Sequence, residues 1–187
     1  MILPVYAYGQ PVLKQVAADI DKDFPNLIQL LKNMWETLYD AAGVGLAAPQ
    51  IGQSIRLFVV DTEQLENEDK PGFKGFVKIF INARKIEETG EKWAYEEGCL
   101  SIPNIRGEVV RKKTLTLRYL DENFEEHTET FTDMNARVIQ HEYDHIEGVL
   151  FIEHFSPIKR NLIRTKLESI KRGKVKDLEY RMKFPAK

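Results

Sequence analysis

The pentapeptide His141-Glu142-Tyr143-Asp144-His145 constrains the chain more than any other stretch, because its chemistry depends on one backbone conformation. In a helix, His141 and His145 lie one turn apart on the same face, so both imidazoles can reach one metal ion. Glu142 then lies about 100° further round the helix, where it can act as a general base without ligating the ion. Chance alone places such a pattern in about one chain in two hundred of this length. A helix with two exposed histidines and no metal is therefore the alternative.

Length and composition are typical of one globular domain, residues 1–187, long enough to bury a sizeable core. No apolar run approaches the ~18 residues that a membrane helix needs. The first residues do not resemble a secretory signal. The single cysteine, Cys99, excludes an intrachain disulfide and suits a reducing cytosol. Cys99 is then a buried apolar residue, a nucleophile or a metal ligand.

The net charge of −2 conceals a basic C-terminal segment. Residues 159–187 contain eleven Lys and Arg against three acidic residues, which gives this segment +8 and the remainder −10. A basic segment on an acidic body favours an anionic partner such as nucleic acid. A solvated helix face with a frayed end explains the composition equally well.

Hydrophobic periodicity predicts an α+β fold, with antiparallel or mixed strands packed around the helix of the pentapeptide and with further helices near each end. We expect the first helix to be capped near Asp23 and Pro25 and to bury a stripe of Leu27, Leu30, Leu31, Met34 and Leu38. Predicted strands cover 55–61, 77–82, 84–88, 107–121, 125–131 and 149–155. A polar excursion spans Thr62–Gly75. The helix of the pentapeptide should begin at Thr132 or Asp133 and stop at Gly148, and a last helix should run from Pro157 to about Arg172, followed by loosely held residues.

Two histidines do not complete a catalytic metal site, which generally uses three protein ligands and leaves one position for water. One candidate is Glu168, on the last predicted helix, as in an endoprotease. The better candidate is Cys99, since a thiolate binds Zn²⁺ or Fe²⁺ strongly and Gly98 beside it permits close backbone approach. Cys99 is a weaker candidate as a nucleophile, because a coordinated thiolate is occupied.

Three segments together resemble the peptide deformylase family. They are Gly43–Gln50 (Gly-Val-Gly-Leu-Ala-Ala-Pro-Gln), Glu97–Ser101 (Glu-Gly-Cys-Leu-Ser) and Gln140–His145 (Gln-His-Glu-Tyr-Asp-His). Their order and spacing also resemble those of the family, and the similarity spans nearly the whole chain. Two positions depart from the family pattern: Ile146 stands where leucine is common, and Arg137 stands where an apolar residue is usual.

The resemblance implies a metal-dependent hydrolase that removes the formyl group from formyl-methionine at the N-terminus of newly synthesised polypeptides. It implies Cys99, His141 and His145 as ligands of one divalent ion, Fe²⁺ in the cell, with Zn²⁺, Ni²⁺ or Co²⁺ as substitutes. It implies Glu142 as general acid/base, and it implies two oxyanion donors, the side chain of Gln50 and the backbone N–H of Leu100. Backbone positions that hold the substrate in an extended form would be Val44, Gly45 and Gly98.

Other residues near the motifs are candidates for supporting roles. An apolar pocket for the methionine side chain is expected to involve Val44, Met134, Val138 and Tyr143, although core packing explains each of them as well. Arg106 can contact the substrate backbone or remain solvated. Glu97 and Asp144 adjoin candidate ligands, and Arg111 can pair with either, so we expect these groups to orient the ligands. His127 and His154 receive no role.

The substrate that the resemblance implies emerges from a ribosome, which is rich in RNA phosphates. We therefore hypothesise that the basic stretch Lys159–Lys176 contacts ribosomal RNA. Formylated initiation and an N-terminus unlike a transit peptide favour the cytoplasm of a bacterium. No membrane partner is expected. Two alternatives stay open: an endoprotease with Glu168 as third ligand, and a non-enzymatic module that binds metal or peptide.

Overall fold

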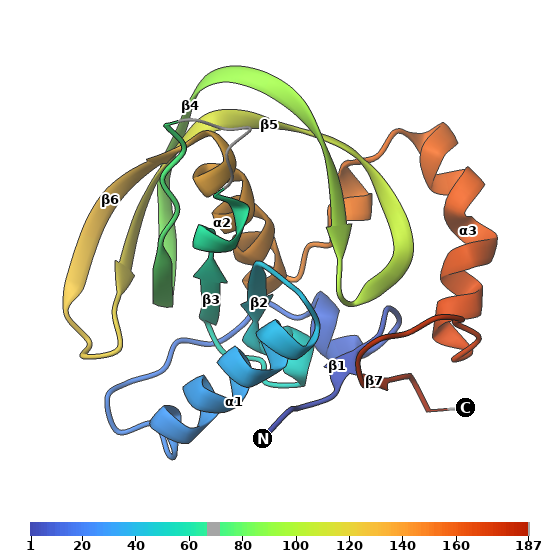
Figure 1. Ribbon diagram of the computed structural model, residues 1–187, viewed down its shortest axis with the longest axis horizontal. Coiled ribbons are helices and arrows are strands. Elements are labelled where there is room, and N and C mark those ends of the chain that lie inside the picture. The colour runs from blue at the N-terminus through green and yellow to red at the C-terminus, as the bar shows by residue number, and fades with distance from the viewer. Residues whose placement is uncertain (67–71, 187) are drawn as a thin grey trace.

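The computed structural model describes residues 1–66 and 72–186, and its elements form an antiparallel sheet with helices around it (Figure 1). The sheet has the order β2-β3-β4-β5-β6, with bounds Gly45–Ala47, Leu57–Asp61, Val77–Cys99, Ile102–Leu120 and Glu126–Thr132. The helices of the described residues are α1 (Leu27–Asp40), α2 (Asp133–Ile146) and α3 (Pro157–Lys171). Two short strands, β1 (Val5–Tyr6) and β7 (Met182–Lys183), pair in parallel. The predicted α+β class with an antiparallel sheet is therefore confirmed.

Strand β3 separates two parts of the hydrophobic core. Phe58 and Val60 belong to the cluster that includes the buried face of α2, whereas Leu57 and Val59 belong to the cluster that includes α1. All five residues of β3 are buried, as its nearly continuous apolar sequence predicts. Long strands β4 and β5 curve over α2 (Figure 1), which packs against β2, β3, β5 and β6.

Strands predicted as separate pieces are parts of two long strands. The segments 77–82 and 84–88 both lie in β4, and the strand expected from residue 107 begins at Ile102. The pairing of β4 with β5 shifts register between Ile81 and Arg84, next to Asn82, whose φ is 51°. At such bulges the alternation of apolar and polar residues is interrupted, and the prediction took the interruption for the end of a strand.

The start of the first helix differs from the prediction. It begins at Leu27, and its N-cap is Asn26 in a left-handed conformation with φ 58°, while Asp23 and Pro25 lie in the preceding turns. The predicted apolar stripe is correct, since its members are buried except for the half-buried Leu30.

The predicted strand 149–155 is wrong, because Phe151–His154 forms a 3-10 helix. The Glu153 carboxylate accepts a hydrogen bond from the N–H of Leu150 at 2.8 Å, which closes this turn. The apolar run buries Leu150, Phe151 and Ile152 all the same. Periodicity cannot distinguish a strand from a helical turn in so short an apolar run.

The C-terminal residues are held rather than loose. Val5 donates its N–H to the carbonyl of Arg181 at 2.8 Å, and Ala7 donates to Lys183 at 2.9 Å. A third core cluster joins this region to α3 and to the first half of β5. It includes Leu13, Ile102, Val109 and Ile170. The prediction missed this pairing because a two-residue strand carries almost no periodic signal.

The predicted excursion Thr62–Gly75 falls partly on residues 67–71, outside the described residues. Its described part contains a 3-10 turn, Glu63–Leu65, and a hydrogen bond from the N–H of Gly75 to the Glu66 carboxylate at 2.7 Å. Over the described ranges, no helix combines the length and apolar character needed to cross a membrane.

Candidate active site

Helix α2 brings the two histidines of the pentapeptide together. The ring centroids of His141 and His145 are 5.2 Å apart, as expected for one helical turn. The helix starts after Thr132, which has an extended backbone as the N-cap, and the chain leaves it through Gly148 with φ +70°. Ala136 and Ile139 are fully buried in the core under the sheet, which leaves the histidine face directed toward the end of β4.

Cys99, the last residue of β4, meets these histidines. Its Sγ lies 3.3 Å from Nε2 of His145, and candidate ligand atoms of Cys99, His141 and His145 all lie within 4.8 Å of one another. A tetrahedral ion with ordinary Zn–S and Zn–N bond lengths separates two such atoms by about 3.5 Å. These three side chains, called the metal group below, therefore fit one small divalent ion. Glu168 is not in this group, because it lies on α3 and pairs with Lys171.

The electrostatics of this group favour a thiolate at Cys99. Burial alone would raise the pKa of the thiol, but the charges and hydrogen bonds of His145 and His141 lower this pKa to about 5. A thiolate is the form of cysteine that ligates a metal.

The carboxylate of Glu97 orients His141, and two arginines hold that carboxylate. Nδ1 of His141 lies 3.0 Å from Glu97 Oε2. Arg111 donates to both Glu97 oxygens, at 2.8 and 3.0 Å, and Arg137 donates to Oε1 at 2.8 Å. Burial alone would raise the pKa of Glu97, yet the hydrogen bonds from His141 and Arg111 hold it far below its ordinary value. Glu97 is thus a charged acceptor that directs Nε2 of His141 toward the metal group.

Asp144 forms a second branch of this buried polar network. Nη1 of Arg111 donates to Asp144 Oδ2 at 2.8 Å, and Nε2 of His154 lies 2.8 Å from the same oxygen. The sequence predicted that Arg111 would pair with Glu97 or Asp144, and it pairs with both. The sequence missed Arg137, whose contact with Glu97 spans 40 residues, and His154, which reaches Asp144 only because the chain folds back after α2. His127 lies outside the network and pairs with Asp121.

Glu142 is buried beside the metal group and points away from this network. Its Oε2 has no hydrogen-bond partner among the described residues, and burial raises its pKa to about 7. The backbone of Gly45 lies directly against its carboxylate. A carboxyl group with a free oxygen and a pKa near neutrality can both accept and donate a proton.

The amide of Gln50 has one defined orientation. Its Oε1 accepts the N–H of Ala47 at 2.8 Å, which directs Nε2 toward Sγ of Cys99 at 3.5 Å and Oγ of Ser101 at 3.4 Å. Gln50 lies in a 3-10 turn, Ala48–Ile51, that follows β2 directly. The glutamine N–H₂ therefore faces the metal group as a hydrogen-bond donor.

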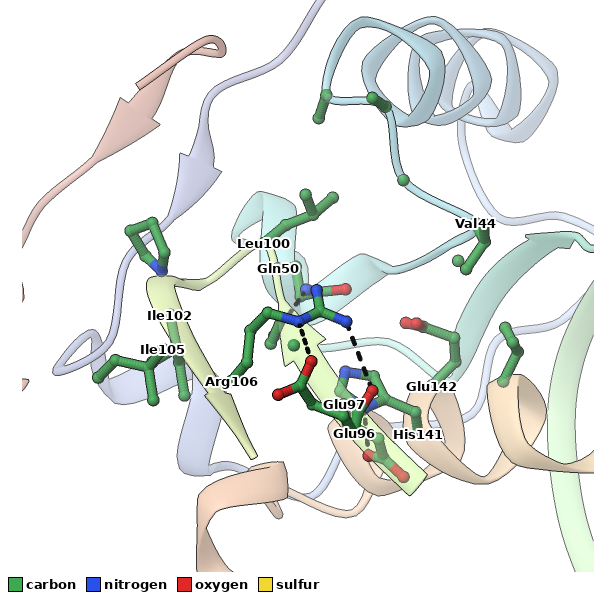
Figure 2. A pocket seen from close by; sticks show the side chains of 18 of the residues that line it. Val44, Gln50, Glu96, Glu97, Leu100, Ile102, Ile105, Arg106, His141 and Glu142 are labelled. Atoms are coloured by element: carbon green, nitrogen blue, oxygen red, sulfur yellow. Dashed lines mark hydrogen bonds and ion pairs between the residues drawn. The ribbon is translucent and has the colours of Figure 1, made fainter. Parts of the chain in front are cut away.

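A groove of about 660 Å³ joins these residues, and Figure 2 shows Val44, Gln50, Leu100, Arg106, His141 and Glu142 around it. Of the residues predicted to bind substrate, the groove is lined by Val44, Gly45, Gly98, Met134, Val138 and Arg106. Tyr143 does not line the groove: its ring packs into the core and its hydroxyl accepts the N–H of Lys85 at 3.3 Å. One wall comes from the C-terminal residues Asp177–Tyr180, which the sequence did not indicate.

The family model described as polypeptide deformylase matches residues 2–161, which covers the sheet, α1, α2 and the candidate ligands. The chain belongs to the polypeptide deformylase family. The peptide deformylase of Christiangramia forsetii is 53% identical over 99% of this chain and 97% of its own length. That of Cytophaga hutchinsonii is 51% identical over the full length of both. The crystal structure of Arabidopsis thaliana peptide deformylase 1B with an inhibitor superposes with a TM-score of 0.81, at 31% identity over 91% of each chain.

Membership in the deformylase family confirms the predicted enzyme class, a metal-dependent peptide deformylase. It does not favour the alternative of an endoprotease with Glu168 as third ligand. The two departures from the family pattern have a place in the structure. Ile146 is fully buried in the core, and Arg137 is the second arginine on Glu97, with its guanidinium 4.5 Å from the ring centre of Trp93.

Proposed function

We propose that this chain removes the formyl group from N-terminal formyl-methionine, with one divalent ion held by Cys99, His141 and His145. The observation that carries the proposal is the convergence of three segments, from the ends of β2 and β4 and the C-terminal half of α2, on one groove. In this proposal α2 is the metal-binding helix around which the sheet is packed, and residues 1–187 act as one domain.

The donor set of one thiolate and two imidazoles suits Fe²⁺ and Zn²⁺ alike. A divalent ion there would lower the pKa of water and polarise the formyl oxygen. We propose Fe²⁺ in the cell, with Zn²⁺, Ni²⁺ or Co²⁺ able to replace it. Glu97 holds the tautomer and orientation of His141, since Nδ1 faces the carboxylate and Nε2 remains for the ion.

Glu142 moves the protons of the reaction. The oxygen of a water molecule bonds to the formyl carbon, the bond from that carbon to the methionine nitrogen breaks, and formate and a free amine leave. Glu142 takes a proton from the water and gives one to the leaving nitrogen. Its free Oε2 and its burial beside the metal group support this role.

Gln50 and Leu100 supply donors for the negative charge that develops on the formyl oxygen. The Gln50 amide already directs Nε2 into the site, so little reorganisation is needed when charge develops. The backbone N–H of Leu100, next to Cys99, is the second donor in this proposal. Loss of one such donor typically lowers the rate by about 10²–10³.

The substrate lies in the groove as an extended peptide held by the backbone of Val44, Gly45 and Gly98. Its methionine side chain enters the apolar part formed by Val44, Met134 and Val138, which line the groove on the α2 side. Arg106 is exposed, pairs with Glu96 at 3.0 Å and lines the groove, so it can contact the substrate backbone.

The test is hydrolysis of formyl-Met-Ala-Ser by apoprotein to which Fe²⁺, Ni²⁺, Co²⁺ or Zn²⁺ is restored without oxygen. Turnover with release of one formate per peptide supports the proposal, and absence of turnover with every metal refutes it. Cys99→Ser should lose metal and activity, whereas Glu168→Gln should keep both. The reverse pattern would assign the third ligand to Glu168.

For location and partners, we propose the cytoplasm of a bacterium and contact of Lys159–Lys176 with ribosomal RNA. Arg160, Arg164 and Lys166 on α3 are exposed, so they are available to phosphates. Arg160→Glu combined with Arg164→Glu should weaken co-sedimentation with ribosomes at low salt and leave hydrolysis of the free tripeptide unchanged. Unchanged co-sedimentation would refute this contact.

A further inference from the structure

We propose that Tyr180 is a positioning residue that holds the Leu100 amide in its working orientation, an inference that rests on the proposed role of that amide. The Tyr180 hydroxyl donates a hydrogen bond to the Leu100 carbonyl at 2.7 Å. Leu100 directly follows Cys99, in the turn that joins β4 to β5 (Figure 2). Tyr180 lies beyond residues 2–161, the part that matches the family model, so this contact comes from a segment that the family match does not include.

Both ends of the chain hold this turn. The carbonyl of Leu100 accepts from Tyr180, and the carbonyl of the next residue, Ser101, accepts the N–H of Tyr8 at 2.8 Å. The two end segments are paired with each other through β1 and β7, which lie side by side in Figure 1. The turn after Cys99 is therefore hydrogen-bonded to the two paired end segments as well as closed by its own hairpin.

The segment that carries Tyr180 is itself anchored on either side. Before it, Nδ2 of Asn104 donates to the carbonyl of Lys176 at 3.1 Å. After it, the carbonyl of Arg181 accepts the N–H of Val5. Tyr180 is half-buried and lines the groove together with Leu178. Because hydrogen bonds to the carbonyls of Lys176 and Arg181 hold the chain before and after Tyr180, its hydroxyl is a well-positioned partner for the turn.

The pairing of Cys99 with Ile102 closes the turn, but this pairing leaves the orientation of the Leu100 peptide groups to other contacts. The register of β4 and β5 shifts between Gly98 and Cys99, and Leu100 lies outside both strands. An amide that stabilises a developing oxyanion must be oriented before the charge appears. The bond from Tyr180 restrains the peptide plane between Leu100 and Ser101, and the Leu100 side chain packs against the α1 cluster. Together these contacts hold the residue whose N–H is the proposed donor.

The test compares Tyr180→Phe with Tyr6→Phe in the full-length, Zn²⁺-loaded enzyme. Tyr6→Phe is the matched control, because the Tyr6 hydroxyl accepts from Lys183 at 2.9 Å and so belongs to the same paired ends without touching Leu100. For formyl-Met-Ala-Ser, we expect Tyr180→Phe to lower kcat about 2- to 12-fold, the effect of one ordinary hydrogen bond, with KM, metal content and Tm near wild type. Tyr6→Phe should leave kcat unchanged.

A second readout does not depend on turnover. In protein labelled with ¹⁵N-leucine, the Leu100 amide signal, assigned by its loss in Leu100→Met, should shift on addition of formate, and this shift should need more formate in Tyr180→Phe. Wild-type kcat and formate response in Tyr180→Phe would overturn the proposal, as would equal losses in both variants. Absence of turnover in the wild type would instead refute the proposed function itself.

Discussion

Gly45 and Glu142 are in such close contact that a Cβ on Gly45 would stand 2.5 Å from Oε1 of Glu142. Gly45 begins β2, where it pairs with Val60, and Glu142 lies on α2. The strand can therefore pass directly over the carboxylate only because residue 45 has no side chain. This contact gives a physical reason for one glycine of the first motif.

Gly45→Ala should displace the Glu142 carboxylate and lower kcat by about 10²-fold, because a shift of about 1 Å in a reacting group can cost that much. Metal content should stay near one ion per chain. Gly43→Ala is the comparison variant: its Cβ would meet the methyl ends of the Leu38 and Leu100 side chains, at 2.8 and 3.1 Å, and not Glu142, so it should lower kcat less than Gly45→Ala does. A Gly45→Ala enzyme with wild-type kcat would contradict the assigned contact.

The second arginine on Glu97 should contribute to metal affinity. Arg137→Met keeps the volume of the side chain but removes its hydrogen bonds to Glu97 and to the carbonyls of Val109 and Trp93. Loss of a group that orients a metal ligand typically weakens metal binding about 10- to 100-fold. The measurement is competition for Zn²⁺ against a chelator, with Arg84→Met, which loses an exposed pair with Asp19, as control. Equal affinities in the two variants would show that Arg111 alone suffices.

The charge at the C-terminal wall of the groove should influence which peptides are processed. Asp177 and Glu179 are exposed, line the groove and form no ion pair within the described part of the chain. We expect kcat/KM for formyl-Met-Ala-Lys to exceed that for formyl-Met-Ala-Glu by about 2- to 5-fold at low salt, the scale of one exposed charge pair. The preference should fade in 0.5 M NaCl and in the double variant Asp177→Asn, Glu179→Gln. A preference that persists after both changes would show that Asp177 and Glu179 do not cause it.

Stability in acid should depend on Glu129, at the far end of the sheet. Burial would raise the pKa of this carboxyl, but hydrogen bonds from Lys78 and Tyr119 lower it below the ordinary value. Because the folded pKa lies below that of the unfolded chain, about 4.3, the stabilisation is present above this value and is lost as pH falls through the folded pKa. Metal-free Glu129→Gln should thus have a lower Tm than metal-free wild type at pH 7, and the difference should shrink toward pH 3. A constant difference would rule out this titration.

Much of the fold could be predicted because its signals are local. The stripe from Leu27 to Leu38 and the apolar run of β3 depend on neighbouring residues, so periodicity alone locates them. The bulge at Asn82 was misread because it depends on pairing with β5. The turn at Phe151–His154 was misread because periodicity does not distinguish a strand from a helical turn in so short an apolar run. The pairing of β1 with β7 joins residues about as far apart as the chain allows, and no local pattern marks it.

The sequence by itself predicted the side chains that the proposed function uses: two imidazoles one helical turn apart, a lone cysteine and a glutamine in a small-residue segment. Donor atoms and helical spacing are local properties, and three motifs in order identify a family. Only the tertiary structure decided which groups hold those side chains in place. Arg137 reaches Glu97 across 40 residues and Tyr180 reaches Leu100 across 80. Such contacts are decided by how strands curve and how chain ends pair, which depends on the packing of the whole molecule.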